Sequence, residues 1–320
     1  MITLSNSLDR NRQALPSSKG SILVTGCTGL LGSNLCYHLK DEYRVVGISR
    51  NPLNMSGIEW ISGDISDSDF GESIIANNEF DVVIHCAALT DVDRCEEAPD
   101  LAMQINRDAS ICLARAAASN EAKFVFISTD AVFSGNKCSP YTEVDPVDPI
   151  NVYGLSKAQA EEAILLLDDV LVLRTNMYGF NYLNKTSFSE WILSALRREE
   201  KLRMFDDVRF SALLVNDLVK GIKKSVEADL NGIYHLASRD SMTKYEFGIA
   251  LAQAADIQGE IKSVSVDDMS FSAQRSKNMA LDSTKLSSIL GVTMPSMQEG
   301  IARYVALEQE GYPAILKGNG

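Results

Sequence analysis

A tyrosine and a lysine four residues apart are the side chains in this sequence best suited to proton transfer. Tyr153 and Lys157 fall in a segment that is expected to be helical, so the spacing puts both on one helix face. A phenol is a weak acid with a pKa of about 10, and a neighbouring ammonium favours its ionised form. Ser128 and Thr129, at the end of an expected strand, add hydroxyls that could orient a carbonyl oxygen. Beside a nicotinamide, these side chains would form a site for carbonyl reduction.

A glycine-rich stretch, TGCTGLLG at residues 25–32, follows a short apolar run and precedes a segment with leucines at helical spacing. Its three glycines suit a tight turn, a close approach of backbone amides to a pyrophosphate, and close packing of helix on strand. The helix that begins here would also present partial positive charge to phosphates. The stretch therefore predicts a dinucleotide site. The residues expected to contribute are Gly26, Thr28, Gly29, Leu30, Leu31 and Gly32.

Residues at the ends of the next strands favour one dinucleotide over the other. Ser49 and Arg50 end the second expected strand, where an acidic residue would bind the adenosine ribose and repel a 2′-phosphate. The arginine instead offers a planar guanidinium that suits a phosphate, so we expect NADP(H), with NAD(H) as the alternative. A solvated arginine without a ligand is the competing interpretation. Further cofactor contacts are expected from Asp64 at the adenine amino group, from its neighbour Ile65, and from the small run Cys86-Ala87-Ala88 at the ribose.

These side chains need a sheet whose strand ends meet at one edge, and the first half of the chain predicts such a sheet. Apolar strands are expected at residues 21–25, 44–48, 58–61, 81–86, 123–128 and 171–174, with helices at 30–40, 66–78, 100–119 and 151–167 between them. This alternation is typical of the α/β class with a doubly wound parallel sheet, the Rossmann arrangement. At roughly 150 residues per domain, the length also allows a second unit.

The chain is expected to divide into three parts. Residues 1–20 read as a polar N-terminal leader, and residues 21–175, with later segments returning to them, as the dinucleotide-binding domain. Residues 176–320 read mainly as a smaller C-terminal substrate-binding lobe. Within this lobe, helices near 186–198, 216–226 and 243–255 are expected to alternate with strands at 232–236 and 261–264.

Composition excludes several classes of partner and site. The 320 residues carry 30 basic and 43 acidic side chains, a net charge of −13, which argues against nucleic acid or an anionic membrane as the partner. The six cysteines contain no CxxC pair and only three histidines are present, so no metal site is expected. His85, within an apolar strand, is expected to be a satisfied core residue. Reduced thiols and a polar N-terminus predict a cytoplasmic protein.

Four stretches resemble the extended short-chain dehydrogenase/reductases, and most of all the dTDP-4-dehydrorhamnose reductase family. They are TGCTGLLG (25–32), CAALTDVDRCEEAP (86–99), STDAVFSG (128–135) and PINVYGLSKAQAEE (149–162), with weaker similarity continuing to about residue 303. The resemblance implies NADPH-dependent reduction of a 4-keto-6-deoxy sugar nucleotide for polysaccharide biosynthesis, with a homodimer as the assembly to consider. It implies Thr129, Tyr153 and Lys157 as the catalytic set, with Ser128 as a supporting hydroxyl.

The same resemblance implies where the substrate binds. Thr90, Val92 and Asp93 match the loop that borders the sugar, Asn106 matches a residue supporting the strand ends, and Arg275 is a candidate for the diphosphate or else a surface ion pair. The family often carries a tryptophan after the sixth strand, where this chain has Asn176 and Met177. The wall of the sugar pocket is therefore altered, which leaves the particular sugar open.

Other members of the superfamily provide the alternatives. Sugar-nucleotide dehydratases carry a glutamate directly after the STD aspartate, and the alanine at position 131 leaves elimination without its base. A 4-epimerase stays open, although Arg50 favours an exchangeable NADPH over a tightly held NAD(H). A non-catalytic, NADP-binding regulatory subunit like that of methionine adenosyltransferase also stays open, and the intact Tyr153 and Lys157 argue against it.

Overall fold

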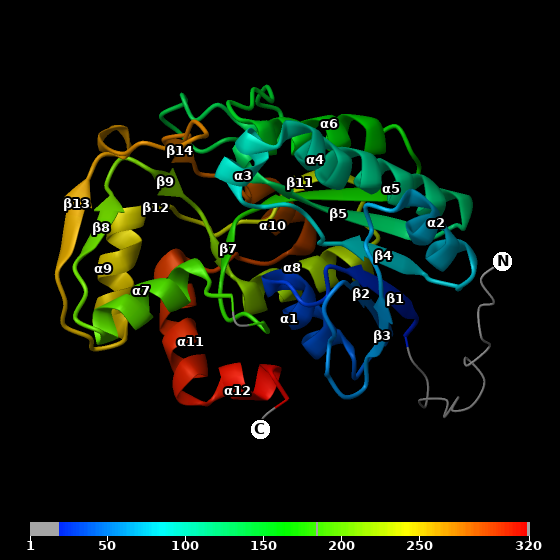
Figure 1. The fold of residues 1–320 in the computed structure, drawn as a ribbon, viewed down its shortest axis with the longest axis horizontal. Helices are drawn as coiled ribbons and strands as arrows, with labels where there is room; N and C mark the ends of the chain where they lie inside the picture. The colour runs from blue at the N-terminus through cyan, green and yellow to red at the C-terminus, as the bar shows by residue number, and fades with distance from the viewer. Residues whose placement is uncertain (1–18, 184, 319–320) are drawn as a thin grey trace.

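A parallel sheet of seven strands forms the centre of the molecule (Figure 1). The computed structural model describes residues 19–183 and 185–318. All neighbouring strands of this sheet pair in parallel. In spatial order they are β11 (Gly232–His235), β6 (Val170–Thr175), β5 (Lys123–Thr129), β4 (Val82–His85), β1 (Ser21–Thr25), β2 (Arg44–Ser49) and β3 (Glu59–Ser62). The predicted doubly wound α/β class is confirmed.

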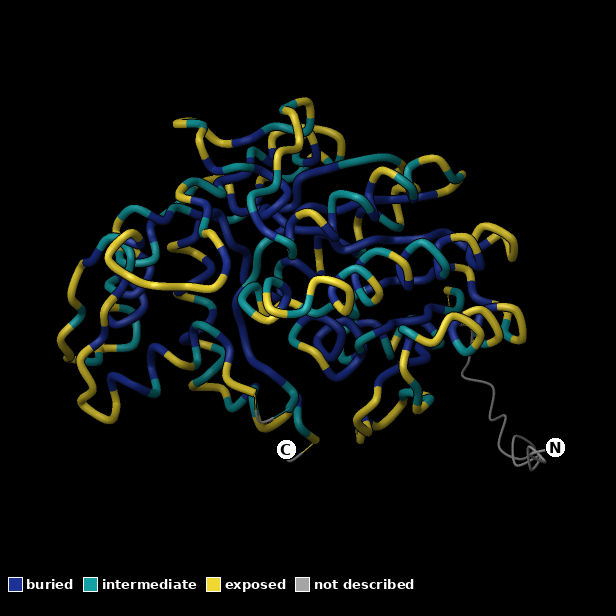
Figure 2. Tube along the Cα trace, turned by 45° about the horizontal axis from the view of Figure 1, so that its top comes forward, coloured by how far each residue is buried: buried dark blue, intermediate teal, exposed yellow. Residues whose placement is uncertain are grey.

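Helices cover both faces of the sheet because its strands are apolar on both sides. Side chains alternate between the faces, so Ile22 and Val24 of β1 pack on one side and Leu23 on the other. The first side carries α1 (Leu30–Leu39) and α8 (Val215–Glu227), and the second carries α2 (Ser68–Ala76), α5 (Ala109–Ser119) and α6 (Val152–Ile164). Figure 2 shows the resulting distribution, with buried segments along the sheet and exposed ones on peripheral turns and loops.

A smaller lobe lies at one end of the sheet (Figure 1). Its helices are α7 (Phe188–Arg197), α9 (Lys244–Ala254) and α11 (Met297–Gln309), and its short strands include β8 (Leu202–Phe205), β9 (Arg209–Phe210), β12 (Met242–Thr243), β13 (Ile261–Val264) and β14 (Asn278–Met279). The paired β7 (Met177–Tyr178) and β10 (Leu213–Leu214) connect the lobe to the sheet. Two further helices, α10 (Thr284–Leu290) and α12 (Tyr312–Leu316), pack near β11 and α1.

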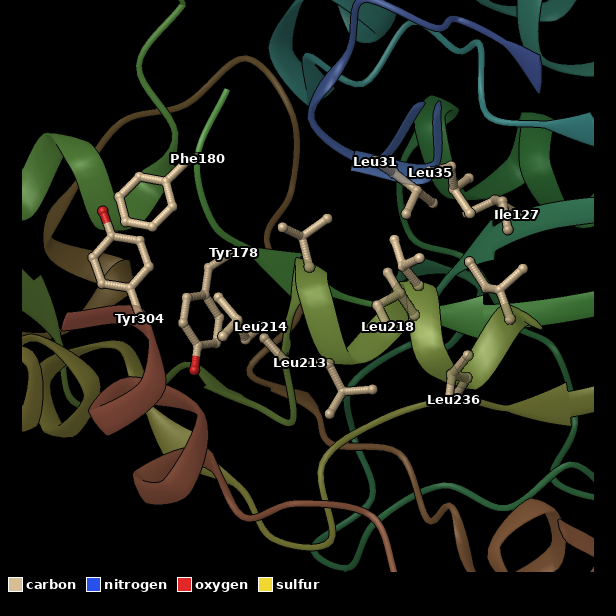
Figure 3. Close-up of a cluster of buried hydrophobic side chains, with 14 of the residues drawn as sticks. Leu31, Leu35, Ile127, Tyr178, Phe180, Leu213, Leu214, Leu218, Leu236 and Tyr304 are labelled. Carbon is tan, nitrogen blue, oxygen red and sulfur yellow. The ribbon is translucent and has the colours of Figure 1, made fainter. Parts of the chain in front are cut away.

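One continuous apolar cluster joins the lobe to the sheet. It runs from Leu31 and Leu35 on α1 through Leu218 on α8 to Tyr178 and Tyr304 (Figure 3). All of these side chains are at most 5% exposed. Because such a cluster loses apolar contact when the parts separate, the lobe is held in a fixed position against the sheet.

Three expectations about the elements need correction. Residues 232–236 were expected to form a strand of the lobe, but β11 extends the main sheet, and the helix expected at 216–226 packs on α1. The helix expected at 100–119 contains a π-helical turn, Met103–Asp108, between α4 (Pro99–Ala102) and α5.

The leader expected at residues 1–20 falls almost wholly outside the described residues. No helix in the described ranges is long and apolar enough to cross a bilayer.

Candidate active site

Tyr153 is held beside the end of β5 by the way α6 begins. The Asn151 side chain caps the helix by accepting a hydrogen bond from Gly154 N (2.9 Å), and its amide donates to Gln274 O (3.0 Å). Gly154 packs directly on the 3₁₀ turn η2 (Asp130–Val132), where an added Cβ would lie 2.2 Å from Ala131 O. Only glycine permits this approach, which brings Tyr153 beside Thr129.

The surroundings of Tyr153 keep its phenol protonated. Burial raises the pKa of Tyr153 to about 12, a hydrogen bond from Thr129 opposes the shift, and the charges of Asp130 and Cys95 add to it. The sequence had predicted that the Lys157 ammonium would favour ionisation of the phenol. Lys157 is not among the groups that shift the pKa of Tyr153 here, and the effect expected of its ammonium stays a prediction.

Lys157 points toward the end of β4. Its side chain is 2% exposed, and its Nζ lies 3.8 Å from the centroid of the Phe126 ring. Burial lowers the pKa of Lys157 to about 7, while Glu161 and Cys86 act in the opposite direction. Lys157 is therefore close to Cys86, where the sequence predicted the cofactor ribose.

The two hydroxyls at the end of β5 have different surroundings. Neighbouring residues of a strand face opposite sides, and only Thr129 faces Tyr153. Ser128 donates to the Glu161 carboxylate, which is also paired with Arg174 (Nη2–Oε2 2.6 Å), both side chains being 3% exposed. Ser128 thus ties β5 to α6, as a supporting hydroxyl would.

The glycine-rich turn has the shape that a pyrophosphate requires. Gly26 has a φ of +67°, and a Cβ on Gly32 would lie 2.3 Å from Gly26 O. Gly29 caps α1 without any side chain, which leaves the first amides of the helix accessible. The side chains of Thr28 and Leu31 are buried, so the backbone supplies the cradle. The turn fits a dinucleotide.

At the adenosine end, the four predicted residues differ in what they can offer. The Arg50 side chain is 74% exposed and forms a long ion pair with Asp64 (Nη1–Oδ2 3.7 Å), so most of its guanidinium faces solvent, where a phosphate can approach. Ile65 beside Asp64 is buried. Ser49 is otherwise engaged: it accepts hydrogen bonds from Trp60 Nε1 (3.0 Å) and Cys27 Sγ (3.1 Å) and donates to Asn51 O (2.6 Å). The Ser49 hydroxyl is therefore saturated by protein partners, and the cofactor contact predicted for Ser49 stays a prediction.

Asp93 and Arg275, both predicted to contact the substrate, contact each other. Arg275 Nη2 lies 2.5 Å from the Asp93 carboxylate, which also accepts from Ala273 N (3.0 Å). Asp93, whose side chain is 33% exposed, therefore connects the segment that contains Ala273 and Arg275 to α3 (Val92–Glu97). Arg275 Nη1 is buried with no partner in the part of the chain that the structure describes, and a cavity of about 600 Å³ adjoins it. This orphaned group keeps Arg275 a candidate for an anionic ligand.

The remaining predicted residues lie around the same edge. Thr90 is exposed, and Val92 and Met177 are half-buried. Asn106 lies in the π-helical turn. Its side chain accepts a hydrogen bond from Leu89 N (2.8 Å) and donates to Leu89 O (3.0 Å) and to Ser156 Oγ on α6 (3.1 Å). It braces the strand end as expected.

Two polar side chains at the site were not predicted from the sequence. Asp130 is 3% exposed and accepts from Thr129 and from Asn176, and Lys244 at the start of α9 faces it from the lobe. The STD motif contained a signal for Asp130, whereas Lys244 had none. Across residues 19–183 and 185–318, no group of His, Cys, Asp and Glu could hold a metal ion.

Comparisons with known proteins agree with this geometry. Residues 20–309 match the RmlD substrate binding domain. The probable low-salt glycan biosynthesis reductase Agl14 of Haloferax volcanii is 30% identical over 287 residues, covering 87% of this chain and 95% of that protein. Methionine adenosyltransferase 2 subunit beta of Rattus norvegicus is also 30% identical, over 86% of this chain and 83% of its own length.

A solved structure is similar over almost its whole length. It is the dTDP-4-dehydrorhamnose reductase of Bacillus anthracis in complex with NADP, with a TM-score of 0.82, 28% identity, and coverage of 90% of this chain and 99% of that one. The predicted resemblance is thereby confirmed, and the chain belongs to the RmlD substrate-binding domain family, with the extended short-chain dehydrogenase/reductase fold.

Proposed function

We propose that this protein is an NADPH-dependent reductase of a 4-keto-6-deoxy sugar nucleotide. The observation that carries the proposal is the position of a protonated phenol, Tyr153, beside the Thr129 hydroxyl at the same sheet edge as the glycine-rich turn. Similarity to a reductase of glycan biosynthesis and to a dTDP-4-dehydrorhamnose reductase bound to NADP supports both the substrate class and the cofactor.

The residues act as follows in this proposal. Bound NADPH supplies a hydride to the keto carbon. Tyr153 gives its proton to the keto oxygen, so that the carbonyl becomes an alcohol, and Thr129 positions that oxygen. Lys157 binds the nicotinamide ribose near Cys86. Ser128 acts only through its support of α6.

The cofactor and substrate would extend along the sheet edge to either side of Tyr153. The backbone of Gly26–Gly32 binds the pyrophosphate, Arg50 binds the 2′-phosphate, and Asp64 with Ile65 borders the adenine. On the substrate side, Asn176 and Met177 form part of the sugar wall, Thr90 and Val92 border it, and Arg275 binds the diphosphate. Asp93 acts by holding Arg275.

The test is NADPH consumption with a panel of 4-keto-6-deoxy sugar nucleotides, followed by absorbance at about 340 nm. We expect Tyr153→Phe to lower turnover by ~10²-fold or more, with little change in NADPH affinity. The matched control is Tyr234→Phe on β11, which should keep full turnover. Normal turnover in Tyr153→Phe would remove the assigned role. Stoichiometric NADPH consumption also excludes a 4-epimerase, which returns its cofactor unchanged.

The similarity to methionine adenosyltransferase 2 subunit beta favours a second candidate, an NADP-binding regulatory subunit. The same panel of 4-keto-6-deoxy sugar nucleotides distinguishes the reductase from the regulatory subunit. A protein that binds NADPH, reduces none of the substrates and co-elutes with a methionine adenosyltransferase would be a regulatory subunit. The catalytic set is retained in this chain, so we place the reductase first.

A further inference from the structure

A lysine of the lobe presents an ammonium that has no hydrogen-bond partner among the described residues. Lys244 is the first residue of α9, and its Nζ lies 3.4 Å from the centroid of the Phe210 ring and 4.7 Å from that of the Phe188 ring. Two aromatic rings therefore hold the cation. Across residues 19–183 and 185–318, no acceptor forms a hydrogen bond or an ion pair with it. An ammonium carries three N–H donors, and all three are left for water or a ligand.

Lys244 rests on the same stretch of chain that supports the expected wall of the sugar pocket. β12, directly before α9, pairs with β9, which carries Phe210. Farther along, β10 pairs with β7, and Leu213 donates from its backbone N to Asn176 O (2.9 Å). Residues 209–214 thus support both the ring against Lys244 and the wall residue Asn176. Figure 1 shows β9 and β12 on the side of the lobe that faces the sheet.

The wall residue Asn176 is fixed from the sheet side, and Lys244 lies on the lobe side. Asn176 Nδ2 donates to Asp130 Oδ2 (2.6 Å), directly after β5. Asp130 and Lys244 are close enough for their charges to interact, yet they form no ion pair, so the distance between them exceeds direct contact. The Lys244 side chain is half-buried, and its nitrogen is not among the fully buried atoms that lack a partner. A ligand can therefore reach the ammonium.

Packing alone does not account for a lysine at this position. A half-buried ammonium without hydrogen bonds lowers the free energy of unfolding, and the positive end of the helix dipole at the start of α9 adds to that cost. Burial lowers the pKa of Lys244 to about 8, which still leaves mostly the ammonium form at pH 7. A methionine would fill the same space between the two rings without either cost. The missing acceptors are therefore expected in a ligand.

Resting on the proposed function, we propose that Lys244 is a specificity-determining residue that donates a hydrogen bond to a hydroxyl oxygen of the substrate's sugar, from the lobe side of the wall that contains Asn176. A 4-keto-6-deoxy hexose offers its hydroxyls at C2 and C3 for this contact. The proposed function assigns the diphosphate to Arg275, beside a cavity that Lys244 does not line. An ammonium that binds one of these hydroxyls selects against sugars that lack it, because its donor would then stay unpaired.

The decisive variant is Lys244→Met, which removes the donor and keeps the packing between the rings. Its kcat/KM is compared with that of the wild type on a 4-keto-6-deoxy sugar nucleotide and on two analogues, one lacking the hydroxyl at C2 and one lacking that at C3. In the wild type, we expect one analogue to lose ~10–10²-fold, the effect of a hydrogen bond from a charged group. Lys244→Met should lose the same factor on the parent substrate and nothing further on that analogue.

Stability and cofactor binding distinguish a substrate contact from a role in packing. Lys244→Met should keep the wild-type affinity for NADPH and should unfold at the wild-type urea concentration or above it, because an unpartnered ammonium is removed. The matched control is Lys285→Met. The Nζ of Lys285 also lies over a ring, 4.3 Å from the centroid of Tyr234, but it donates to Ile233 O (2.8 Å). That variant should leave kcat/KM unchanged on all three substrates.

The outcomes separate this proposal from the proposed function. The role of Lys244 is overturned if Lys244→Met equals the wild type on the parent substrate, or if it loses the same factor on the parent and on both analogues, as a structural defect would. A wild type that reduces no sugar nucleotide overturns the proposed function. Calorimetric binding of the parent and the two analogues, which needs no turnover, then decides the role of Lys244 by the same comparison. A wild type that binds no sugar nucleotide overturns both.

Discussion

The change Gly154→Ala tests whether the contact between α6 and η2 sets the position of Tyr153. An alanine Cβ would lie 2.2 Å from Ala131 O and 3.0 Å from Pro149 Cβ. Since nonbonded heavy atoms prefer separations of about 3.5 Å, the helix start must move by about 1 Å. Both obstacles belong to rigid parts of the chain, a backbone carbonyl and a proline ring, so the helix itself has to shift.

The magnitude follows from two opposing terms. Alanine in place of glycine within a helix contributes about 1 kcal/mol to the free energy of unfolding, whereas overpacking costs about 1–3 kcal/mol. We expect a net loss of about 1 kcal/mol. Turnover should suffer more, because a displacement of about 1 Å in a catalytic group costs roughly 10²-fold. NADPH affinity should change little, since the glycine-rich turn is untouched.

The assay combines urea unfolding, NADPH binding by fluorescence and turnover of the reductase. Gly248→Ala on α9 is the matched control: its Cβ meets the end of the Met204 side chain (2.3 Å from Sδ), which can rotate away. It should keep normal turnover. If Gly154→Ala equals the wild type in both stability and turnover, the close approach does not position Tyr153.

Two further predictions concern the cofactor. Arg50→Ala should raise the KM for NADPH by ~10-fold while changing the KM for NADH little, because only NADPH carries the 2′-phosphate that the guanidinium can bind. Steady-state kinetics with each cofactor measure both KM values, and an equal rise for the two cofactors would contradict the prediction. NADPH affinity should fall as the pH rises from about 7 to 9. Burial lowers the pKa of Lys157 to about 7, whereas a bound ribose oxygen needs the ammonium form of this side chain. Binding of NADPH above pH 7 must therefore be accompanied by uptake of a proton. Calorimetry in buffers of different ionisation enthalpy measures that proton, and Lys157→Met should abolish its uptake.

The sequence predicted those parts of the site that depend on local geometry. A glycine at each of three spaced positions and a YxxxK pair on one helix face determine a turn and a shared surface within a few residues. The expected core role of His85 is confirmed, since its ring nitrogens contact Thr25 Oγ1 (2.7 Å) and Ser110 Oγ (2.9 Å). The alternation of apolar strands with helices was likewise sufficient to predict the α/β fold class.

The parts that the sequence missed depend on contacts between distant segments. The Ser49 hydroxyl is engaged by Trp60, a residue of the neighbouring strand β3, and Asp93 is engaged by Arg275, 182 positions away. Residue type shows that a hydroxyl or a cation is present, but its availability depends on which partner the fold brings to it. β11 was misplaced for a similar reason, because a short apolar run carries no information on which sheet it joins.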